Sequence, residues 1–586
     1  MMRPTVLALL FVSIALVPSL SSETASSPAK QSKGPRFEIS FSSSLQATAI
    51  TGRVFLTISR KGETKEGQLK GDRLLFGVDA EHLKPGATAI IDENTLGYPV
   101  KSLKDIPPGD YFVQGLLSVY TEFHRSDGHT IWAHMDQGEG QNFRRSPGNL
   151  FSEVQKVHLD PGTDYTAHLY LTKTIPPIEV PADTQWVKRI KLQSKLLTQF
   201  WGRPIYLGAT ILLPKGYEEH PATYYPVLYL QGHFNPGAPF GFTADPKRTR
   251  GCKPRSVRQG QKFNVTDPAD ECDDSGGELT MPESGVEFYE SWNSDHFPRM
   301  IAVTFQHPTA FYDDSYAVNS ANTGPYGDAI MTELIPFVEK TFRIIAKPYA
   351  RLLAGASTGG WEALALQIYH PEFFGGSWAV APDPVDFRRY ELINIYSDDN
   401  AFTAPGSEWL PAERYDSRTP DGQPRVTVRD FSRMETVLGS KGRSGGDQDN
   451  WEAVYGPTDD EGYPKPLWNK RTGKIDHNVA NYMKEHGYDL RDYLEKNWTR
   501  IGPQLVGKLH LICGDMDNFF LNQAAYLLED FLENTKVPYY AGSFDWGRPM
   551  KGHGWQPTTH AELIRQMAKH IAEHAEPGDA PQLWNY

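Results

Sequence analysis

Ser357 lies in the run Gly355-Ala-Ser-Thr-Gly359, a G-x-S-x-G pattern in which the serine can act as a nucleophile. A strand-like apolar run at 351–355 precedes it, and a helix-like run from Trp361 follows it. The two glycines leave room for a sharp strand-to-helix turn that presents the hydroxyl at a helix N-terminus. The pattern therefore predicts covalent catalysis with Ser357 as the attacking group.

A serine hydroxyl is a weak nucleophile near neutral pH, so a general base must lie within hydrogen-bond reach of it. His553, in the run Lys551-Gly-His-Gly-Trp555, is the candidate because it falls between the last predicted strand and the last predicted helix. His560, His570 and His574 lie in or near a polar helical stretch, and we expect them to face solvent.

The base needs a carboxylate that fixes its tautomer and stabilises the imidazolium. Asp517 fits best, because it comes just after the strand-like run 508–513. Asp515 is the alternative, although it could instead hold the loop or cap the next helix. The chain order Ser357, Asp517, His553 is the order that α/β-hydrolases use.

The tetrahedral intermediate of acyl transfer needs preorganised N–H donors. We expect one from the backbone amide of Thr358, directly after the nucleophile. The second should come from the turn after the strand 226–230, where the amide of His233 is our first choice and that of Phe234 the second. The His233 side chain could also be a metal ligand or a second base, but a backbone role is the commoner one.

The elements that must position these groups follow a pattern typical of a parallel sheet covered by helices. From residue 224 onward, strand-like apolar runs alternate with helical ones. Strands are predicted at 226–230, 300–305, 351–355, 377–381, 508–513 and 537–541, and helices at 328–340, 361–369, 522–533 and 561–573. Residues 383–503 interrupt the pattern with irregular Gly-, Asp- and Trp-rich sequence, which predicts an inserted cap. Its tryptophans, Trp409, Trp451, Trp468 and Trp498, could stack on a substrate, but anchoring the cap is the better explanation.

The N-terminal part has a different pattern. Short alternating or β-branched runs separated by Pro-Gly and Asp-Gly turns predict an all-β sandwich at 37–174. Residues 175–181 form a proline linker, and 182–586 form the catalytic domain. The apolar run 6–17 behind Met-Met-Arg predicts a signal peptide at 1–21, followed by a flexible leader at 22–36 and export to the periplasm or medium.

Three cysteines occur. In an exported protein Cys252 and Cys272 could form a disulfide, although spacing alone leaves two free thiols open. Cys513 lies in an apolar run and is expected to be a buried free thiol. The evenly spaced His124, His129 and His134 suggest a metal site only weakly, because the Ser-Asp-Gly between them is typical of a hairpin turn. We expect no metal and no cofactor.

The chain has 586 residues, a net charge of −13 and a pI near 5.8. This charge opposes binding to nucleic acids and to anionic lipid surfaces. We expect no stable membrane insertion, because the N-terminal apolar run 6–17 is too short to span a bilayer. The expected partner is a small-molecule or polysaccharide-linked ester.

Several runs together resemble the family called "Putative esterase", which includes S-formylglutathione hydrolases, enterochelin esterases, feruloyl esterases and mycolyltransferases. They are Gly324-Pro-Tyr-Gly-Asp-Ala-Ile330 with Glu333-Leu-Ile-Pro336, the turn at Ser357, Gly514-Asp-Met-Asp-Asn-Phe519 and Gly552-His-Gly554. The resemblance covers roughly residues 205–575 apart from inserted stretches. It implies an α/β-hydrolase fold, no cofactor and an acyl-enzyme at Ser357.

In that family the catalytic acid follows Gly-x-x-Asp, which maps onto Gly514 and Asp517 and favours Asp517 over Asp515. Two inserted stretches, 383–503 and the loop holding Cys252 and Cys272, are larger than in minimal members. The substrates of that family therefore cannot be assigned to this chain from the resemblance. We expect a serine esterase acting on a bulky, partly polar ester of a carbohydrate-linked, feruloyl or siderophore type. The alternatives are an acyltransferase and a non-catalytic binding protein on the same scaffold.

Overall fold

The computed structural model describes residues 34–71, 73–246, 283–407, 409–576 and 579. The predicted signal peptide, most of the leader, and Cys252 with Cys272 lie outside these residues. Within them no helix has the length and apolar character needed to cross a membrane. Cys513 is a buried free thiol, as predicted.

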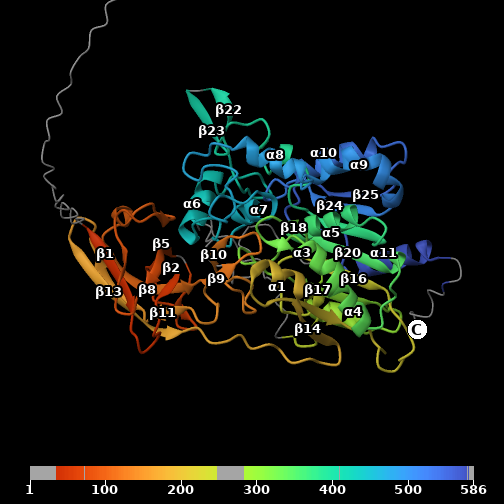
Figure 1. The fold of residues 1–586 in the computed structure, drawn as a ribbon. Helices are drawn as coiled ribbons and strands as arrows, with labels where there is room; N and C mark the ends of the chain where they lie inside the picture. Colours follow the sequence, from red (N-terminus) through yellow and green to blue (C-terminus); the bar gives the residue numbers. More distant parts are fainter. Residues whose placement is uncertain (1–33, 72, 247–282, 408, 577–578, 580–586) are drawn as a thin grey trace, which may run out of the picture.

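The N-terminal residues 35–174, here called the β part, form a nine-stranded sheet in the order β6-β1-β13-β11-β8-β2-β5-β7, with β12 paired to β8 (Figure 1). These strands are β1 (Pro35–Phe41), β2 (Ile50–Ser59), β5 (Leu74–Leu83), β6 (Ala89–Ile91), β7 (Gly97–Tyr98), β8 (Gly109–Val119), β11 (Leu150–Ser152), β12 (Gln155–Leu159) and β13 (Tyr165–Thr174). The sequence predicts a sandwich of two stacked sheets; in the structure these nine strands are hydrogen-bonded into one continuous sheet. The short β11 pairs with both β8 and β13 and so joins the two halves.

The sheet of the β part folds around a single apolar core. Phe37 and Ile39 of β1, Leu169 of β13 and Val54 and Leu56 of β2 belong to the same buried cluster, although β8 and β11 separate these strands in the hydrogen-bonded order. Alternate residues of β2 and β8 face the other side, as the two-residue period of a strand requires.

The second sheet carries the predicted site. Its eight strands run in the order β14-β15-β17-β16-β20-β21-β24-β25, antiparallel across β15 and parallel from β17 onward. The strands are β14 (Val187–Ser194), β15 (Ile205–Leu212), β16 (Val227–Gln231), β17 (Ile301–Gln306), β20 (Arg351–Ala356), β21 (Gly376–Val380), β24 (Leu509–Gly514) and β25 (Ser543–Gly547). We call residues 187–576 the α/β part.

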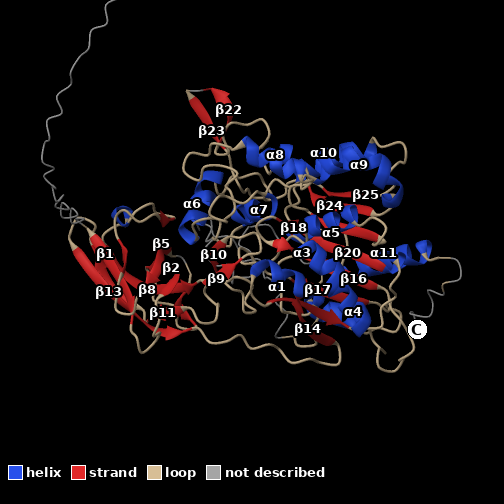
Figure 2. Ribbon diagram, viewed as in Figure 1, coloured by secondary structure: helices blue, strands red, loops and turns tan. Residues whose placement is uncertain are grey.

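Helices cover both faces of this sheet (Figure 2). Helices α5 (Thr358–Tyr369), α9 (Leu490–Leu505) and α10 (Asn522–Glu533) share a core with Ala379 and Leu511 of the sheet. On the other face α2 (Gly285–Trp292) and α11 (His560–His574) pack with Trp378. Helices α1 (Lys195–Trp201), α3 (Tyr326–Ala329) and α4 (Ile335–Thr341) pack at the β14 end.

Two sequence predictions for this region are wrong. The last strand is Ser543–Gly547 rather than 537–541, because Pro538 has no N–H to give to a ladder and Val537 is exposed. His560 and His570 are buried rather than solvent-facing. They occupy the apolar face of α11 at helical spacing, where the His560 ring packs against Phe240 and the His570 ring against Trp378.

Residues 383–503 contain four α-helices among mostly irregular connections, whereas the sequence indicated irregular structure throughout. They contain α6 (Val428–Leu438), α7 (Asp447–Tyr455), α8 (His477–Glu485) and α9, as well as a hairpin of β22 (Thr403–Ser407) and β23 (Leu410–Glu413) that protrudes at the top of Figure 1. Gly- and Asp-rich connections between short helices hid the helical period from the sequence. Trp451, Trp468 and Trp498 are buried anchors, as expected, whereas Trp409 on the hairpin is 85% exposed.

The segment does not form one detached cap. Helix α9 packs on α5 as a covering helix of the sheet. Helix α6 lies on the outer face of the β part, where Met434 and Val437 share an apolar cluster with Phe55 and Leu116. Arg53 of β2 also donates to the carbonyl oxygen of Val437 at 2.8 Å.

The hairpin of β9 (Thr121–His124) and β10 (Thr130–Ala133) confirms the predicted turn between His124 and His129. Its apolar side belongs to the core of the α/β part, because Phe123, Ile131 and Ala133 cluster with Leu197 and Trp201. The two parts of the chain therefore share a core at this hairpin. Four further two-residue strands are β3 (Thr64–Lys65), β4 (Gln68–Leu69), β18 (Asn319–Ser320) and β19 (Gly324–Pro325).

Candidate active site

Ser357 sits at a strained turn between β20 and α5. Its backbone has φ 81° and ψ −113°, a region that non-glycine residues rarely occupy, and it is the residue directly before the helix. Its amide donates to the carbonyl oxygen of Val380 and its carbonyl accepts from the amide of Asp383. The turn is thus fixed by the end of β21 and the loop that follows it, and the hydroxyl is held at the N-terminus of α5.

The glycines of the G-x-S-x-G pattern are required by close backbone contacts. A Cβ placed on Gly355 would lie 2.2 Å from the carbonyl oxygen of Gly359. A Cβ placed on Gly359 would lie 2.2 Å from the carbonyl oxygen of Gln231, at the end of β16. Backbone atoms cannot give way cheaply, so these two positions need glycine. The turn at Ser357 is consequently packed directly against the loop that follows β16.

Asp517 and His553 come together at the ends of the neighbouring strands β24 and β25. Asp517 is fully buried, and its Oδ2 lies 2.7 Å from Nδ1 of His553. Its other oxygen, Oδ1, accepts from the amides of Phe519 and Leu521. These bonds fix the carboxylate, which in turn orients the imidazole so that Nε2 is the nitrogen left to act as a base.

Asp515 has a different role. Its Oδ1 accepts from the backbone amide of Lys551 at 3.0 Å, two residues before His553. In the same loop, the side-chain oxygen of Asn518 accepts from the amide of His553 at 2.7 Å. Both contacts hold the histidine loop against the loop after β24. Of the two acids considered from sequence, the structure brings Asp517 to the imidazole and Asp515 to the backbone.

Asp383 is a site residue that the sequence reasoning missed. It follows β21 and is 5% exposed. The Ser357 hydroxyl donates to its Oδ1 at 3.4 Å, and the hydroxyls of Thr358 and Tyr316 donate to Oδ2. The available signal was its position, because it follows a central strand just as Asp517 follows the next strand of the sheet.

Burial raises the pKa of Asp383 to about 6, although the Tyr316 hydrogen bond opposes this. The charges of His233 and His553 also lower its pKa, so both imidazoles lie within electrostatic range of the carboxylate beside Ser357. Tyr316 is itself held by Trp451 of α7, whose indole N–H donates to the phenol oxygen at 2.6 Å. The insertion thus reaches the nucleophile through Trp451, Tyr316 and Asp383.

The two predicted oxyanion donors flank the turn. The Thr358 amide is the first helical N–H of α5, a position whose donors have no partner within the helix. The loop after β16 starts at Gly232 with φ 141°, and a Cβ there would lie 3.9 Å from Cα of Gly359. His233 follows Gly232 directly, so its backbone is brought beside the nucleophile turn.

One side of the site is bordered by the turn 418–423 of the insertion. The Arg418 amide donates to the carbonyl oxygen of Asn518, and the Asn518 side-chain amide donates back to the carbonyl oxygen of Arg418. The Arg418 guanidinium also donates to the carbonyl oxygen of Asp517. Pro420 lies against Gly552, next to His553, and Gly422 against Met516. A part of the insertion therefore lies beside the acid and the base, while α6 and α9 lie elsewhere.

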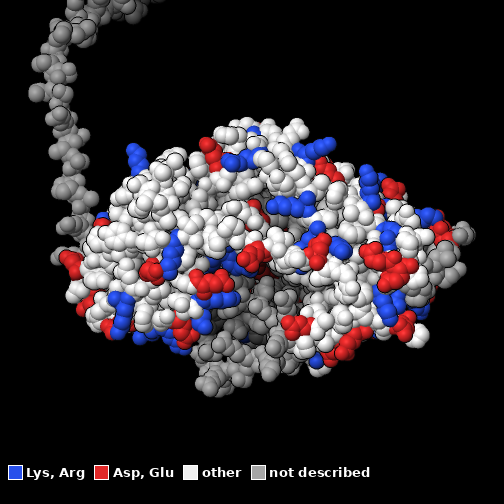
Figure 3. Space-filling model, turned by 90° about the horizontal axis from the view of Figure 1, so that it is seen from below, with Lys and Arg blue, Asp and Glu red and all other residues white. Residues whose placement is uncertain are grey.

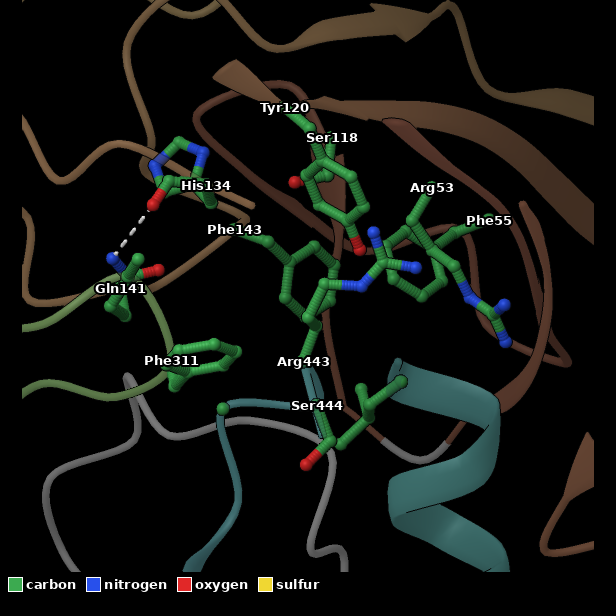
Figure 4. A pocket seen from close by; sticks show the side chains of 13 residues that line it. Arg53, Phe55, Ser118, Tyr120, His134, Gln141, Phe143, Phe311, Arg443 and Ser444 are labelled. Atoms are coloured by element: carbon green, nitrogen blue, oxygen red, sulfur yellow. Dashed lines mark hydrogen bonds between the residues drawn. The ribbon is translucent and has the colours of Figure 1, made fainter. Parts of the chain in front are cut away.

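Two cavities lie away from Ser357. One, of about 30 Å³, lies between the β part and the α/β part and is lined by Arg53, Phe143, Phe311 and Arg443 among others (Figure 4). That volume suits about one water molecule. The other, of about 280 Å³, is lined by Trp378, His510 and residues of α11. Figure 3 shows acidic and basic side chains interspersed over the face seen from below, with no extended basic surface there.

The comparisons with known proteins agree with the geometry. Residues 206–429 match the family model described as "Putative esterase". This match includes Ser357, while Asp517 and His553 lie beyond it. No curated protein sequence matches the chain.

Among solved structures, a ferulic acid esterase is 16% identical, with a TM-score of 0.33 over 66% of this chain and 98% of that one. An S-formylglutathione hydrolase from Staphylococcus aureus is 13% identical, with a TM-score of 0.30 over 66% and 99%. An S-formylglutathione hydrolase from Agrobacterium tumefaciens is 13% identical, with a TM-score of 0.30 over 67% and 96%. The family match confirms the resemblance seen in the sequence: residues 206–429 are similar to the Putative esterase family, and this similarity supports an esterase.

Proposed function

We propose that the protein hydrolyses a carboxylic ester through an acyl-enzyme on Ser357, with His553 as general base and Asp517 as its partner. The observation that carries the proposal is the pairing of the strained turn at Ser357 with the 2.7 Å contact between Asp517 and His553. A nucleophile and an oriented base at one edge of a parallel sheet are what acyl transfer requires.

In the proposed reaction His553 takes the Ser357 proton as the oxygen attacks the ester carbonyl. The amides of Thr358 and His233 bind the oxyanion, each worth about 3 kcal/mol of barrier. His553 then protonates the leaving alcohol. In the second half of the reaction His553 takes a proton from water, which attacks the acyl-enzyme carbonyl. His553 then returns the proton to Ser357 as the carboxylic acid is released. Because the resting hydroxyl of Ser357 is directed at Asp383, it must turn toward His553 when substrate binds.

We further propose that the ester is bulky and partly polar. The Asp383 carboxylate accepts from Ser357 and is itself bonded to the Tyr316 phenol, and the turn with Pro420 and exposed Asp421 lies beside His553. Such a rim can contact groups far from the scissile bond, as a carbohydrate-linked, feruloyl or siderophore ester would offer. The N-terminal sequence supports action outside the cytoplasm, after export.

A phosphonate probe that reacts with active serines tests the mechanism, followed by mass spectrometry of the labelled peptide. We expect labelling at Ser357 and turnover of at least one ester from a set of aryl acetates, feruloyl esters and a catecholate siderophore. Labelling elsewhere, or none with the folded protein, would reject the proposal. Transfer of the acyl group to an added sugar in place of water would identify an acyltransferase.

The double variant Pro420→Ala with Asp421→Ala tests the substrate class. We expect kcat/KM to fall severalfold for the bulky ester and to change little for a small aryl acetate. Equal losses for both would mean that the turn supports the Asp517 and His553 loops and does not contact substrate.

A further inference from the structure

His233 meets two carboxylates beside the candidate oxyanion loop. His233 follows β16, while Asp313 and Asp314 lie in the loop after β17. Nδ1 of His233 lies 3.1 Å from Oδ1 of Asp313 and 3.4 Å from Oδ2 of Asp314. The three candidate ligand atoms all lie within 4.8 Å of one another, and the phenol oxygen of Tyr312 is 3.4 Å from the same nitrogen.

Asp314 is placed as a metal ligand would be. Its side chain is 1% exposed, and its Oδ1 accepts from the amide of Tyr316 at 3.0 Å. Its Oδ2, directed at His233, is buried and accepts no hydrogen bond from the described residues. Nδ1 of His233 is nearer to Asp313, so it gives Asp314 Oδ2 an ion-pair contact at 3.4 Å but no hydrogen bond. A buried carboxylate oxygen without a donor costs stability unless a cation satisfies it.

Two further carboxylate side chains lie near His233, Asp313 and Asp314. Asp447 of α7 accepts from the Tyr312 hydroxyl, and Glu362 of α5 is fully buried nearby. Burial, followed by the charge of Asp314, holds the pKa of Glu362 well above its usual range. A protonated His233 supplies one positive charge against this set, whereas a divalent cation supplies two.

We propose that His233, Asp313 and Asp314 bind a divalent transition-metal ion of the Zn²⁺ type. One imidazole nitrogen with two carboxylate oxygens suits Zn²⁺, while Ca²⁺ and Mg²⁺ prefer all-oxygen ligands. In a tetrahedral zinc site with bonds of about 2.0–2.1 Å, ligand atoms lie about 3.3 Å apart. The separations of 3.1 and 3.4 Å around His233 agree with this value.

The ion would have a positioning role. It ties the His233 side chain to the loop after β17, and the His233 backbone carries one candidate oxyanion amide. The bound metal therefore holds the amide in place without touching the ester. Metal binding is measured directly, so this inference can fail while ester hydrolysis stands, and it can hold if hydrolysis fails.

The test is a calorimetric titration of Zn²⁺ into the full-length protein after dialysis against a chelator, with metal content measured on the protein as purified. We expect one Zn²⁺ per chain, and binding weaker by about tenfold or more in both Asp313→Asn and Asp314→Asn. The matched control is His158→Gln, which removes an exposed His–Asp pair with Asp110 and should bind as wild type. Substitution with Co²⁺ should give the absorption of a four-coordinate site.

Wild-type protein that takes up no Zn²⁺, Mn²⁺ or Co²⁺ would overturn the proposal, whatever the variants do. The same holds if Ca²⁺ alone binds, or if the His158 variant loses as much metal as the Asp variants. Circular dichroism of each variant shows whether it is folded. If both Asp variants unfold, wild-type stoichiometry and the Co²⁺ spectrum still decide the question.

Discussion

Oδ2 of Asp517 lies 2.7 Å from Nδ1 of His553, and the two residues come from loops after adjacent parallel strands. The nearby Asp515 accepts instead from the Lys551 amide. Asp517→Asn should therefore lower kcat by about 10⁴-fold, because the imidazole loses its tautomer control. Asp515→Asn should cost far less, since the amide side chain can still accept from Lys551. Steady-state rates on one aryl ester compare the two, and a reversed order would exchange the roles of these acids.

Ser357→Ala should abolish turnover, with a loss on the order of 10⁴-fold or more. The substitution also removes a hydroxyl that donates to buried Asp383, so the melting temperature should change little or fall slightly. Activity and thermal unfolding are measured on the same preparation. Ser43→Ala, at an exposed serine after β1, serves as the matched control. A Ser357 variant with near-wild-type activity would show that another group is the nucleophile.

Asp383→Asn should stabilise the protein at neutral pH. The folded-state pKa is raised from 3.8 to about 6, so between about pH 4 and 6 the unfolded chain loses the proton that the folded chain keeps. Stability of the wild type therefore falls as the pH rises through this window, by on the order of 3 kcal/mol at most. In Asp383→Asn the amide oxygen can still accept from Tyr316 and Thr358, without the buried charge.

The advantage of the Asp383→Asn variant should thus be small at pH 4 and complete above pH 6. Unfolding by heat or urea across this range measures it. Asp399→Asn, an exposed aspartate of the same insertion, is the control and should show no such trend. A stability difference that is constant from pH 4 to 8 would contradict the burial of a charged Asp383.

Phe123→Ala should destabilise the α/β part, although Phe123 belongs to the N-terminal part of the chain. Its ring lies 4.9 Å from that of Trp201 and is almost fully buried. Removing a buried phenylalanine costs about 3–5 kcal/mol. We expect esterase activity and helical circular dichroism to be lost together at a lower temperature than in wild type. Tyr170→Ala, at an exposed ring of β13, is the control. Loss of β structure with activity retained would show that the two parts unfold separately.

Local patterns predicted the catalytic core well. The G-x-S-x-G turn and the helix 522–533 appear in the structure where the sequence placed them, because their chemistry and periodicity are local. Asp383 was missed because a single acid after a strand has no pattern of its own. Its role depends on Tyr316, Thr358 and Ser357 meeting it from different elements.

The parts that failed depend on contacts between distant residues. No local signal in 121–133 indicates that this hairpin packs with Trp201, or that Arg53 would bind the carbonyl oxygen of Val437. The helices of 383–503 were hidden for the same reason, since their apolar faces make sense only against the β part and α5. The pairing of Asp517 with His553, by contrast, could be predicted from strand order and one short motif.

The hairpin β9–β10 has a consequence for how this protein can evolve. Arg125 donates to the carbonyl oxygens of Ala321 and Gly462, and Phe123 packs with Trp201, so a segment that precedes the catalytic sheet in the chain completes its core. A gene fusion that joined this esterase sequence at residue 182 to another N-terminal module would leave Trp201 without its neighbour. Such a fusion should therefore fold less stably than the intact chain, because the β part and the α/β part share this buried contact.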